Sequence, residues 1–335
     1  MKYFITGAAG FIGSHISRML ADDGHQVVAL VRDVRTVGHL TNRGVQIALG
    51  DITDKESMRA PMSGVDGVFH VAAWYKVGVR DRKQAYDINV NGTRNVLELM
   101  KELGIRKGVY TSTIAINSHT RGQSADESYR HTGKCLSEYE RTKRLAHFEV
   151  AEKFQQAGLP LVIVMPGLVY GPGDRSAAAE TFRQYLLGKL PMIPKKTAFS
   201  WAHVDDVARA HLLAMEKGKP GESYIISGPT HTLVEALAMA EAVTGIRAPR
   251  LHVPPWLLKA AAFFMAGLEK VLPLPPLFSS ETLRVSAGVT YIADNSKARR
   301  ELGYAPRSLE DGLRTTLAVL QKEIKAKEGK SPHIQ

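Results

Sequence analysis

Several common sequence features are missing from this 335-residue chain, and each absence excludes a class of protein. There is one cysteine, Cys135, so no intramolecular disulfide can form, which fits a reducing compartment. The first residues, MKYFITGAAG, lack the apolar core and cleavage site of a signal peptide. The apolar run 256–268 is shorter than the roughly 20 residues that span a bilayer, and Lys259 interrupts it. We therefore expect a cytoplasmic protein without an integral membrane segment.

Residues 256–268 still need an interpretation, because they form the most apolar stretch of the chain. We expect a buried helix or a lid over a substrate, and a membrane-surface helix is the alternative. The chain also lacks basic runs interleaved with aromatic residues, although its formal net charge is +11. We therefore predict no nucleic-acid partner. We ascribe the positive charge to a phosphate-rich ligand and a solvated basic face. We also expect no metal site.

The first half of the chain alternates apolar strand-like runs with helical patterns, which predicts parallel βαβ units. Strands are expected at 2–6, 26–32, 45–48, 67–71, 107–111, 161–165 and 223–227, with helices at 13–22, 91–103, 138–156 and 204–215. The strands are continuously apolar, as in sheets covered on both faces. The fold class is therefore α/β, a doubly wound parallel sheet of the Rossmann type with a smaller, mainly helical C-terminal region.

A glycine-rich loop follows the first predicted strand directly. Residues 6–13 read TGAAGFIG, with glycines at 7, 10 and 13 before a helix. Gly7 would allow a tight turn, Gly10 would let backbone amides approach a pyrophosphate, and Gly13 would let helix and strand pack closely. A phosphate at a helix N-terminus is favoured by free N–H groups and by the dipole. The loop therefore predicts dinucleotide binding.

The end of the second strand bears on which dinucleotide binds. Arg32 could hold a ribose 2′-phosphate through paired hydrogen bonds, and Arg35 adds positive charge. Asp33 could instead accept from a 2′-hydroxyl, as NAD sites require. We expect NADP(H), with NAD(H) as the alternative.

A Tyr–Lys pair supplies the chemistry. Residues 139–143 read YERTK, so Tyr139 and Lys143 lie on one helix face about a turn apart. A lysine ammonium can lower the pKa of a neighbouring phenol, which makes that phenol a usable acid or base at a carbonyl or alcohol oxygen.

With these two motifs, nearly the whole chain resembles the extended (atypical) short-chain dehydrogenase/reductase family, within the NAD-dependent epimerase/dehydratase superfamily. The resemblance implies that Thr113 orients the carbonyl, with Ser112 as the fallback, and that Asn89 supports Lys143. It implies cofactor contacts from Gly7, Gly10, Phe11, Ile12, Gly13, Arg32, Asp51, Ile52, Val71, Ala72, Ala73, Thr111, Tyr139, Lys143, Pro166 and Val169. It also implies an NADP-binding part at 1–165 with returning segments near 201–228, and a substrate-binding part at 166–335.

Three departures favour the dihydroflavonol-4-reductase-like branch over nucleotide-sugar enzymes. Leu168 stands where those enzymes keep an asparagine, residues 199–202 lack an arginine, and no acidic pair follows Thr113. A diphosphate would be poorly paired there. We therefore expect hydride transfer between NADP(H) and a small, largely apolar carbonyl or alcohol, walled by residues that include Trp201, Trp256 and the 263–265 cluster. A nucleotide-sugar epimerase or dehydratase and a non-catalytic NADP sensor are the alternatives. Relatives commonly dimerise through two long helices, here 91–103 and 138–156.

Overall fold

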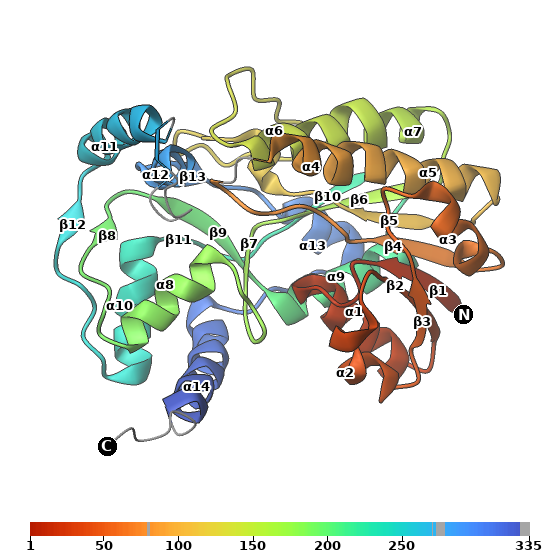
Figure 1. Ribbon diagram of the computed structural model, residues 1–335, viewed down its shortest axis with the longest axis horizontal. Coiled ribbons are helices and arrows are strands. Elements are labelled where there is room, and N and C mark those ends of the chain that lie inside the picture. The colour runs from red at the N-terminus through yellow and green to blue at the C-terminus, as the bar shows by residue number, and fades with distance from the viewer. Residues whose placement is uncertain (79–80, 270, 273–278, 329–335) are drawn as a thin grey trace.

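The computed structural model describes residues 1–78, 81–269, 271–272 and 279–328, and its centre is a seven-stranded, fully parallel sheet (Figure 1). The strand order is β10-β6-β5-β4-β1-β2-β3. The strands are β1 (Lys2–Thr6), β2 (Gln26–Val31), β3 (Gln46–Leu49), β4 (Gly67–His70), β5 (Gly108–Thr111), β6 (Leu161–Pro166) and β10 (Ser223–Ile226). The predicted doubly wound α/β sheet is confirmed, and each predicted strand agrees to within one residue at either end.

Helices cover both faces of this sheet, because its strands are apolar on both sides. On β1, Phe4 enters one buried cluster while Tyr3 and Ile5 enter the other. One face carries α1 (Phe11–Asp22), α2 (Gly38–Thr41), α9 (Val204–Lys217) and α13 (Ser296–Leu302). The opposite face carries α3 (Lys55–Met62), α4 (Arg82–Tyr86), α5 (Gly92–Glu102), α6 (Glu138–Leu145) and α7 (Glu152–Gln156), as Figure 1 shows. A π-helical turn, Ala146–Ala151, joins α6 to α7, so the helix predicted at 138–156 is continuous.

The C-terminal lobe is mainly helical, as predicted, and it also contains several short strands. Its helices are α8 (Ala177–Leu186), α10 (Leu233–Thr244), α11 (Pro255–Leu268), α12 (Ser280–Ser286) and α14 (Leu309–Glu328). Its strands are β7 (Leu168–Tyr170), β8 (Ile193–Pro194), β9 (Ala198–His203), β11 (Thr230–Thr232), β12 (His252–Val253) and β13 (Thr290–Tyr291). Strand β9 pairs with β7, β11 and β13, forming a small sheet that the sequence did not predict.

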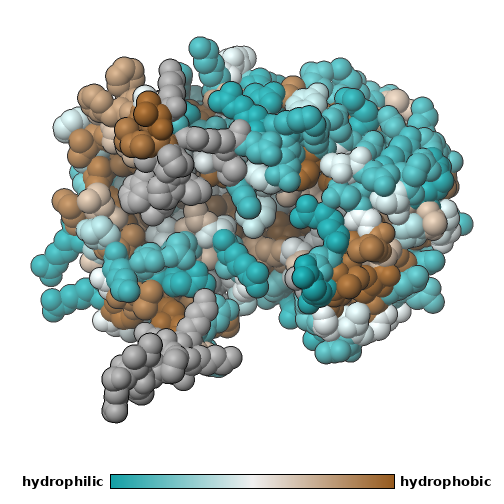
Figure 2. All heavy atoms as spheres, in the orientation of Figure 1, coloured by the Kyte–Doolittle hydropathy of each residue, from teal (hydrophilic) through white to brown (hydrophobic). Residues whose placement is uncertain are grey.

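Two expectations about the lobe's aromatic residues are wrong. Trp201 is 1% exposed and packs against Tyr170, Phe182 and Phe199 in the lobe's own core, so it does not wall a substrate. For residues 256–268 the expected buried helix is wrong, since Ala262 is the one buried residue of α11 and its largest side chains face outward, whereas the substrate lid stays a prediction. Figure 2 shows apolar residues gathered at the corner of the molecule that α11 occupies in Figure 1. Within the described ranges, no helix is both long and apolar enough to cross a membrane.

Candidate active site

The glycine loop lies at the carboxyl end of β1, as predicted, and its glycines are required by close packing. Gly7 has φ +70, and an added Cβ there would lie 2.7 Å from the Ala72 nitrogen. At Gly13 a Cβ would collide with the Gly7 carbonyl oxygen, so α1 and β1 can approach only because residue 13 is glycine. Gly10 donates its N–H to Gly7 and immediately precedes α1.

The N-terminus of α1 fits a phosphate group. Gly10 is the N-cap and offers no side-chain hydrogen bond to the helix amides, and neither of the next two residues, Phe11 and Ile12, is acidic. Backbone donors in the first turn, together with the helix dipole, attract an anion. Val71, Ala72 and Ala73 follow β4 beside this loop, held in part by backbone bonds from Val71 and Ala72 to the Thr6 hydroxyl, each 3.2 Å long.

The two residues that follow β2 are one paired carboxylate, Asp33, and one exposed cation, Arg32. Asp33 accepts hydrogen bonds from Arg35 on both carboxylate oxygens, and this side chain lowers the pKa of Asp33. The Arg32 side chain is 69% exposed, and its nearest ion-pair partner, Asp51, is 4.0 Å away. Arg32 and Asp51 line a cavity of about 450 Å³, while Ile52 beside them is buried.

Tyr139 and Thr113 are brought together from α6 and from the residue that follows β5. Tyr139 is half-buried, whereas Thr113 is 7% exposed. Burial raises the pKa of the Tyr139 phenol, and a hydrogen bond with the Thr113 side chain opposes that rise. The Thr113 hydroxyl also accepts the Ala115 N–H at 3.1 Å, which caps the short 3₁₀ turn after the strand. The predicted acid and the predicted carbonyl-orienting hydroxyl therefore lie side by side.

Lys143 lies on the same helix as Tyr139, but its amine bonds other groups than the Tyr139 phenol that it was expected to influence. Its ammonium group is buried and donates to the Tyr110 hydroxyl at 3.0 Å and to the Thr111 carbonyl at 2.8 Å. Burial lowers the pKa of Lys143 to about 7. The partners found for this amine are thus on β5, and burial, not Lys143, is the main influence on the Tyr139 pKa.

Sequence reasoning missed the hydrogen-bonded chain that extends from Lys143. Tyr110 hydrogen-bonds Thr93 as well as Lys143. Thr93 Oγ1 lies 3.0 Å from His70 Nε2, and His70 Nδ1 lies 2.8 Å from the Thr6 hydroxyl. Burial, with the charge of Lys143, lowers the pKa of His70 to about 3, so this histidine is neutral. The chain runs from α6 to the glycine loop. No spacing in the sequence signals it, because its members come from five separate elements.

Asn89 and Ser112 are close to the site but have other partners. Asn89 donates to Thr142 at 2.9 Å and bonds both backbone groups of Trp74, so it reaches α6 one residue before Lys143. Ser112 bonds His147 at 2.8 Å within the core, away from Thr113. Pro166 ends β6 and Val169 lies in β7, the two strands beyond β5 toward the lobe.

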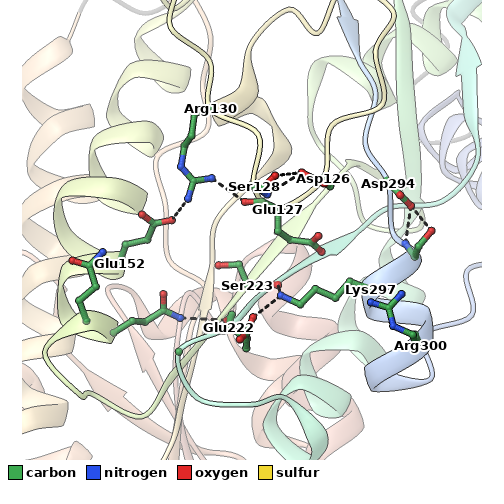
Figure 3. Close-up of a pocket in the computed structure, with 14 residues that line it drawn as sticks. Asp126, Glu127, Ser128, Arg130, Glu152, Glu222, Ser223, Asp294, Lys297 and Arg300 are labelled. Carbon is green, nitrogen blue, oxygen red and sulfur yellow. Dashed lines mark hydrogen bonds and ion pairs between the residues drawn. The ribbon is translucent and has the colours of Figure 1, made fainter.

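A second pocket, about 700 Å³ in volume, holds none of the predicted site residues (Figure 3). It lies between α7, β10 and α13, and most of its lining is charged. Two ion pairs lie within its lining: Arg130 with Glu152 at 2.9 Å, and Lys297 with Glu222 at 2.6 Å. We therefore assign this pocket no part in the chemistry.

Known proteins are similar to this chain in sequence and in fold. Residues 3–227 match the model of the NAD dependent epimerase/dehydratase family. The chain belongs to this family, the extended short-chain dehydrogenases/reductases. A Synechocystis sp. protein provisionally named dihydroflavonol 4-reductase is 35% identical, covering 93% of this chain and 92% of its own. A 2-alkyl-3-oxoalkanoate reductase of Stenotrophomonas maltophilia is 31% identical, covering 94% and 98%.

Among solved structures, UDP-glucose 4-epimerase of Thermotoga maritima has the same fold. It superposes with a TM-score of 0.78 at 25% identity, covering 97% of this chain and all of the epimerase chain. The family uses NAD(P)(H), and the chain is an oxidoreductase of the extended short-chain type. One fold thus serves both reductases and epimerases, so the substrate must be argued from the site itself.

Proposed function

We propose that this protein is an NADP(H)-dependent oxidoreductase that transfers hydride to or from a carbonyl or alcohol carbon of a small, largely apolar organic substrate. The observation that supports this most is the pairing of Tyr139 with Thr113 beside the buried Lys143. A phenol that is still protonated at neutral pH can donate to a carbonyl oxygen as that oxygen becomes an alkoxide.

Tyr139, Thr113 and Lys143 have separate roles in one reversible proton transfer. NADP(H), when bound, supplies or accepts a hydride. In reduction, Tyr139 gives its phenolic proton to the substrate oxygen, which Thr113 holds by a second hydrogen bond. Lys143, anchored to Tyr110 and Thr111, places a positive charge on the same helix face and stabilises the phenolate that remains. In oxidation the phenolate takes the alcohol proton back.

The preference for NADP(H) rests on the two residues at the end of β2. The guanidinium of Arg32 is exposed and weakly paired, so it can bind a 2′-phosphate in a bidentate manner. The competing carboxylate, Asp33, is already engaged by Arg35 on both oxygens. A ribose 2′-hydroxyl would therefore have to compete with an existing ion pair for Asp33.

An apolar substrate is supported by Leu168 and by the names of the relatives. Leu168 is half-buried in β7, where a nucleotide-sugar enzyme would offer an amide to a diphosphate. The two relatives described above are named as reductases of a dihydroflavonol and of a 2-alkyl-3-oxoalkanoate. We assign the cofactor to residues 1–165 and 201–228, and the substrate mainly to the rest of 166–335.

The test is Tyr139→Phe, with a screen of aldehydes and ketones monitored by NADPH consumption. We expect kcat to fall about 10²- to 10⁴-fold while the Kd for NADPH changes less than about twofold. Tyr185→Phe is the control, because it removes a hydrogen-bonded phenol that is buried in the lobe core, and this variant should keep its activity. Full activity of Tyr139→Phe would refute the assignment. If the wild type binds NADPH but reduces no carbonyl, the sensor alternative is favoured.

The four-helix dimer through α5 and α6–α7 remains a prediction. Both helices lie on one face of the sheet (Figure 1), so two copies could pack them around a twofold axis. A dimeric mass in solution by light scattering is expected, and a monomeric mass would refute this mode of assembly.

A further inference from the structure

Helix α11 exposes its largest apolar side chains to solvent, whereas such side chains are usually buried in globular proteins. Trp256 is 69% exposed, Phe263 78% and Phe264 73%. At 3.6 residues per turn these three fall with Leu257 and Leu268 on one side of the helix, opposite the buried Ala262. Contiguous apolar patches of this kind mark interaction sites.

The charges around this patch are all of one sign along the chain. No acidic residue occurs between Glu241 and Glu269, whereas Arg247, Arg250 and Lys259 do. Glu269 itself bonds the backbone and the hydroxyl of Ser280. Lys259 lies on α11 itself and is exposed, so it gives the apolar patch a basic edge.

A neighbouring segment adds to the basic edge. Lys195 and Lys196 are exposed, and the Lys195 N–H bonds the carbonyl of Val253 at 2.8 Å, two residues before α11 begins. Met192 and Leu251, both exposed, flank the same strand pair and extend the apolar surface.

We propose that this surface, made of α11 with Met192, Leu251 and the lysines 195, 196 and 259, binds an anionic lipid bilayer. Fourteen residues make a helix about 21 Å long, short of the roughly 30 Å hydrocarbon core, so α11 lies in the interface rather than crossing it. Aromatic rings suit the boundary between headgroups and acyl chains, and the basic edge attracts anionic headgroups. A second copy of this chain fits less well, because its net charge of +11 and its own basic edge would repel the first.

The docking surface is connected to the active site through α12. Helix α12 packs against α11, and its Glu281 accepts backbone N–H groups from Glu138 at 3.1 Å and Gly78 at 3.0 Å. Glu138 is the first residue of α6, which carries Tyr139. Docking through α11 would therefore hold the start of the catalytic helix one helix away from the bilayer.

The test is co-sedimentation of the full chain with vesicles of phosphatidylcholine, alone or mixed with phosphatidylglycerol. We expect binding to the mixed vesicles, with a shift of Trp256 emission to shorter wavelength. The double variant Phe263→Ser, Phe264→Ser should bind at least about tenfold more weakly, because it loses the two rings that would insert into the bilayer. Both rings are exposed, so the variant should fold, which thermal unfolding checks. Leu49→Ser, an exposed apolar residue on β3, is the matched control and should bind within about twofold of the wild type.

Two further results bear on the proposal. Lys259→Glu with Lys195→Glu should reduce binding to the mixed vesicles at low salt and remove the preference for them over neutral vesicles. Absence of wild-type binding to either vesicle would overturn the proposal. The proposal would also be overturned if the wild type were a dimer in solution and the Phe263, Phe264 variant a monomer. That result would assign the surface to a second copy of the chain. Vesicle binding requires neither cofactor nor substrate, so its failure leaves the oxidoreductase proposal untouched.

Discussion

The sheet half and the C-terminal lobe differ in how far their large apolar side chains are exposed to solvent. In the sheet half every strand except the edge strand β3 is largely buried, and even Lys143 and His70 are enclosed with hydrogen-bonding partners. The lobe has its own core around Trp201, yet α11 exposes two phenylalanines and a tryptophan. The half that holds the reacting groups needs fixed geometry, which burial and hydrogen bonds supply. The proposed bilayer docking would instead use an exposed surface on the lobe.

The largest expected contrast between the two halves comes from adding one methyl group. Gly13→Ala places a Cβ against the Gly7 carbonyl oxygen, so α1 must move away from the loop. We expect a loss of about 3 kcal/mol in unfolding free energy and a matching loss of NADPH affinity. Gly267→Ala in α11 meets nothing within 4 Å and should gain about 0.5–1 kcal/mol. Urea unfolding measures both, and equal effects would refute the contrast.

A smaller effect sharpens the cofactor assignment within the sheet half. Arg32→Ala should weaken NADPH binding about 10- to 100-fold and leave NADH binding within about twofold, because the lost bonds are to the 2′-phosphate. Arg43→Ala, another exposed arginine of the same half that pairs with Asp22, is the control and should change neither. Fluorescence titration with both nucleotides measures this. Equal losses for NADPH and NADH would assign Arg32 to some other contact and favour NAD(H).

A pH-dependent effect, measured as a slope per pH unit, tests whether Lys143 is buried as described. Its pKa is about 7 in the folded chain against 10.5 for the ordinary group, so the unfolded chain binds the extra proton between these values. Unfolding free energy should therefore rise with pH from 7 to 10.5, by at most about 1.4 kcal/mol per pH unit, and this contribution is lost as pH falls toward 7. Lys143→Met should remove that slope. The exposed Lys153→Met should keep the wild-type slope, and a slope retained in Lys143→Met would contradict the burial.

The sequence predicts the sheet half well and the lobe poorly, for physical reasons. Buried parallel strands are continuous apolar runs, and TGAAGFIG and YERTK have fixed spacings, so Gly13 and Tyr139 could be placed in advance. Strands of two or three residues such as β13 carry too little pattern to be recognised. Tyr110 as the partner of Lys143 depends on a contact 33 residues apart. The exposure of α11 was missed because composition does not tell which face of an apolar helix is covered.

The measurement that tests the central claim most directly follows a deuterium label at nicotinamide C4 of NADPH during turnover. The account predicts one deuterium on the former carbonyl carbon of the alcohol product and release of NADP⁺ in equal amount. With Tyr139→Phe the transfer should be about 10²- to 10⁴-fold slower. If the cofactor stays bound and unchanged overall while a sugar nucleotide is isomerised, the protein is an epimerase. That result would contradict the reductase assignment and leave the fold and the family as they stand.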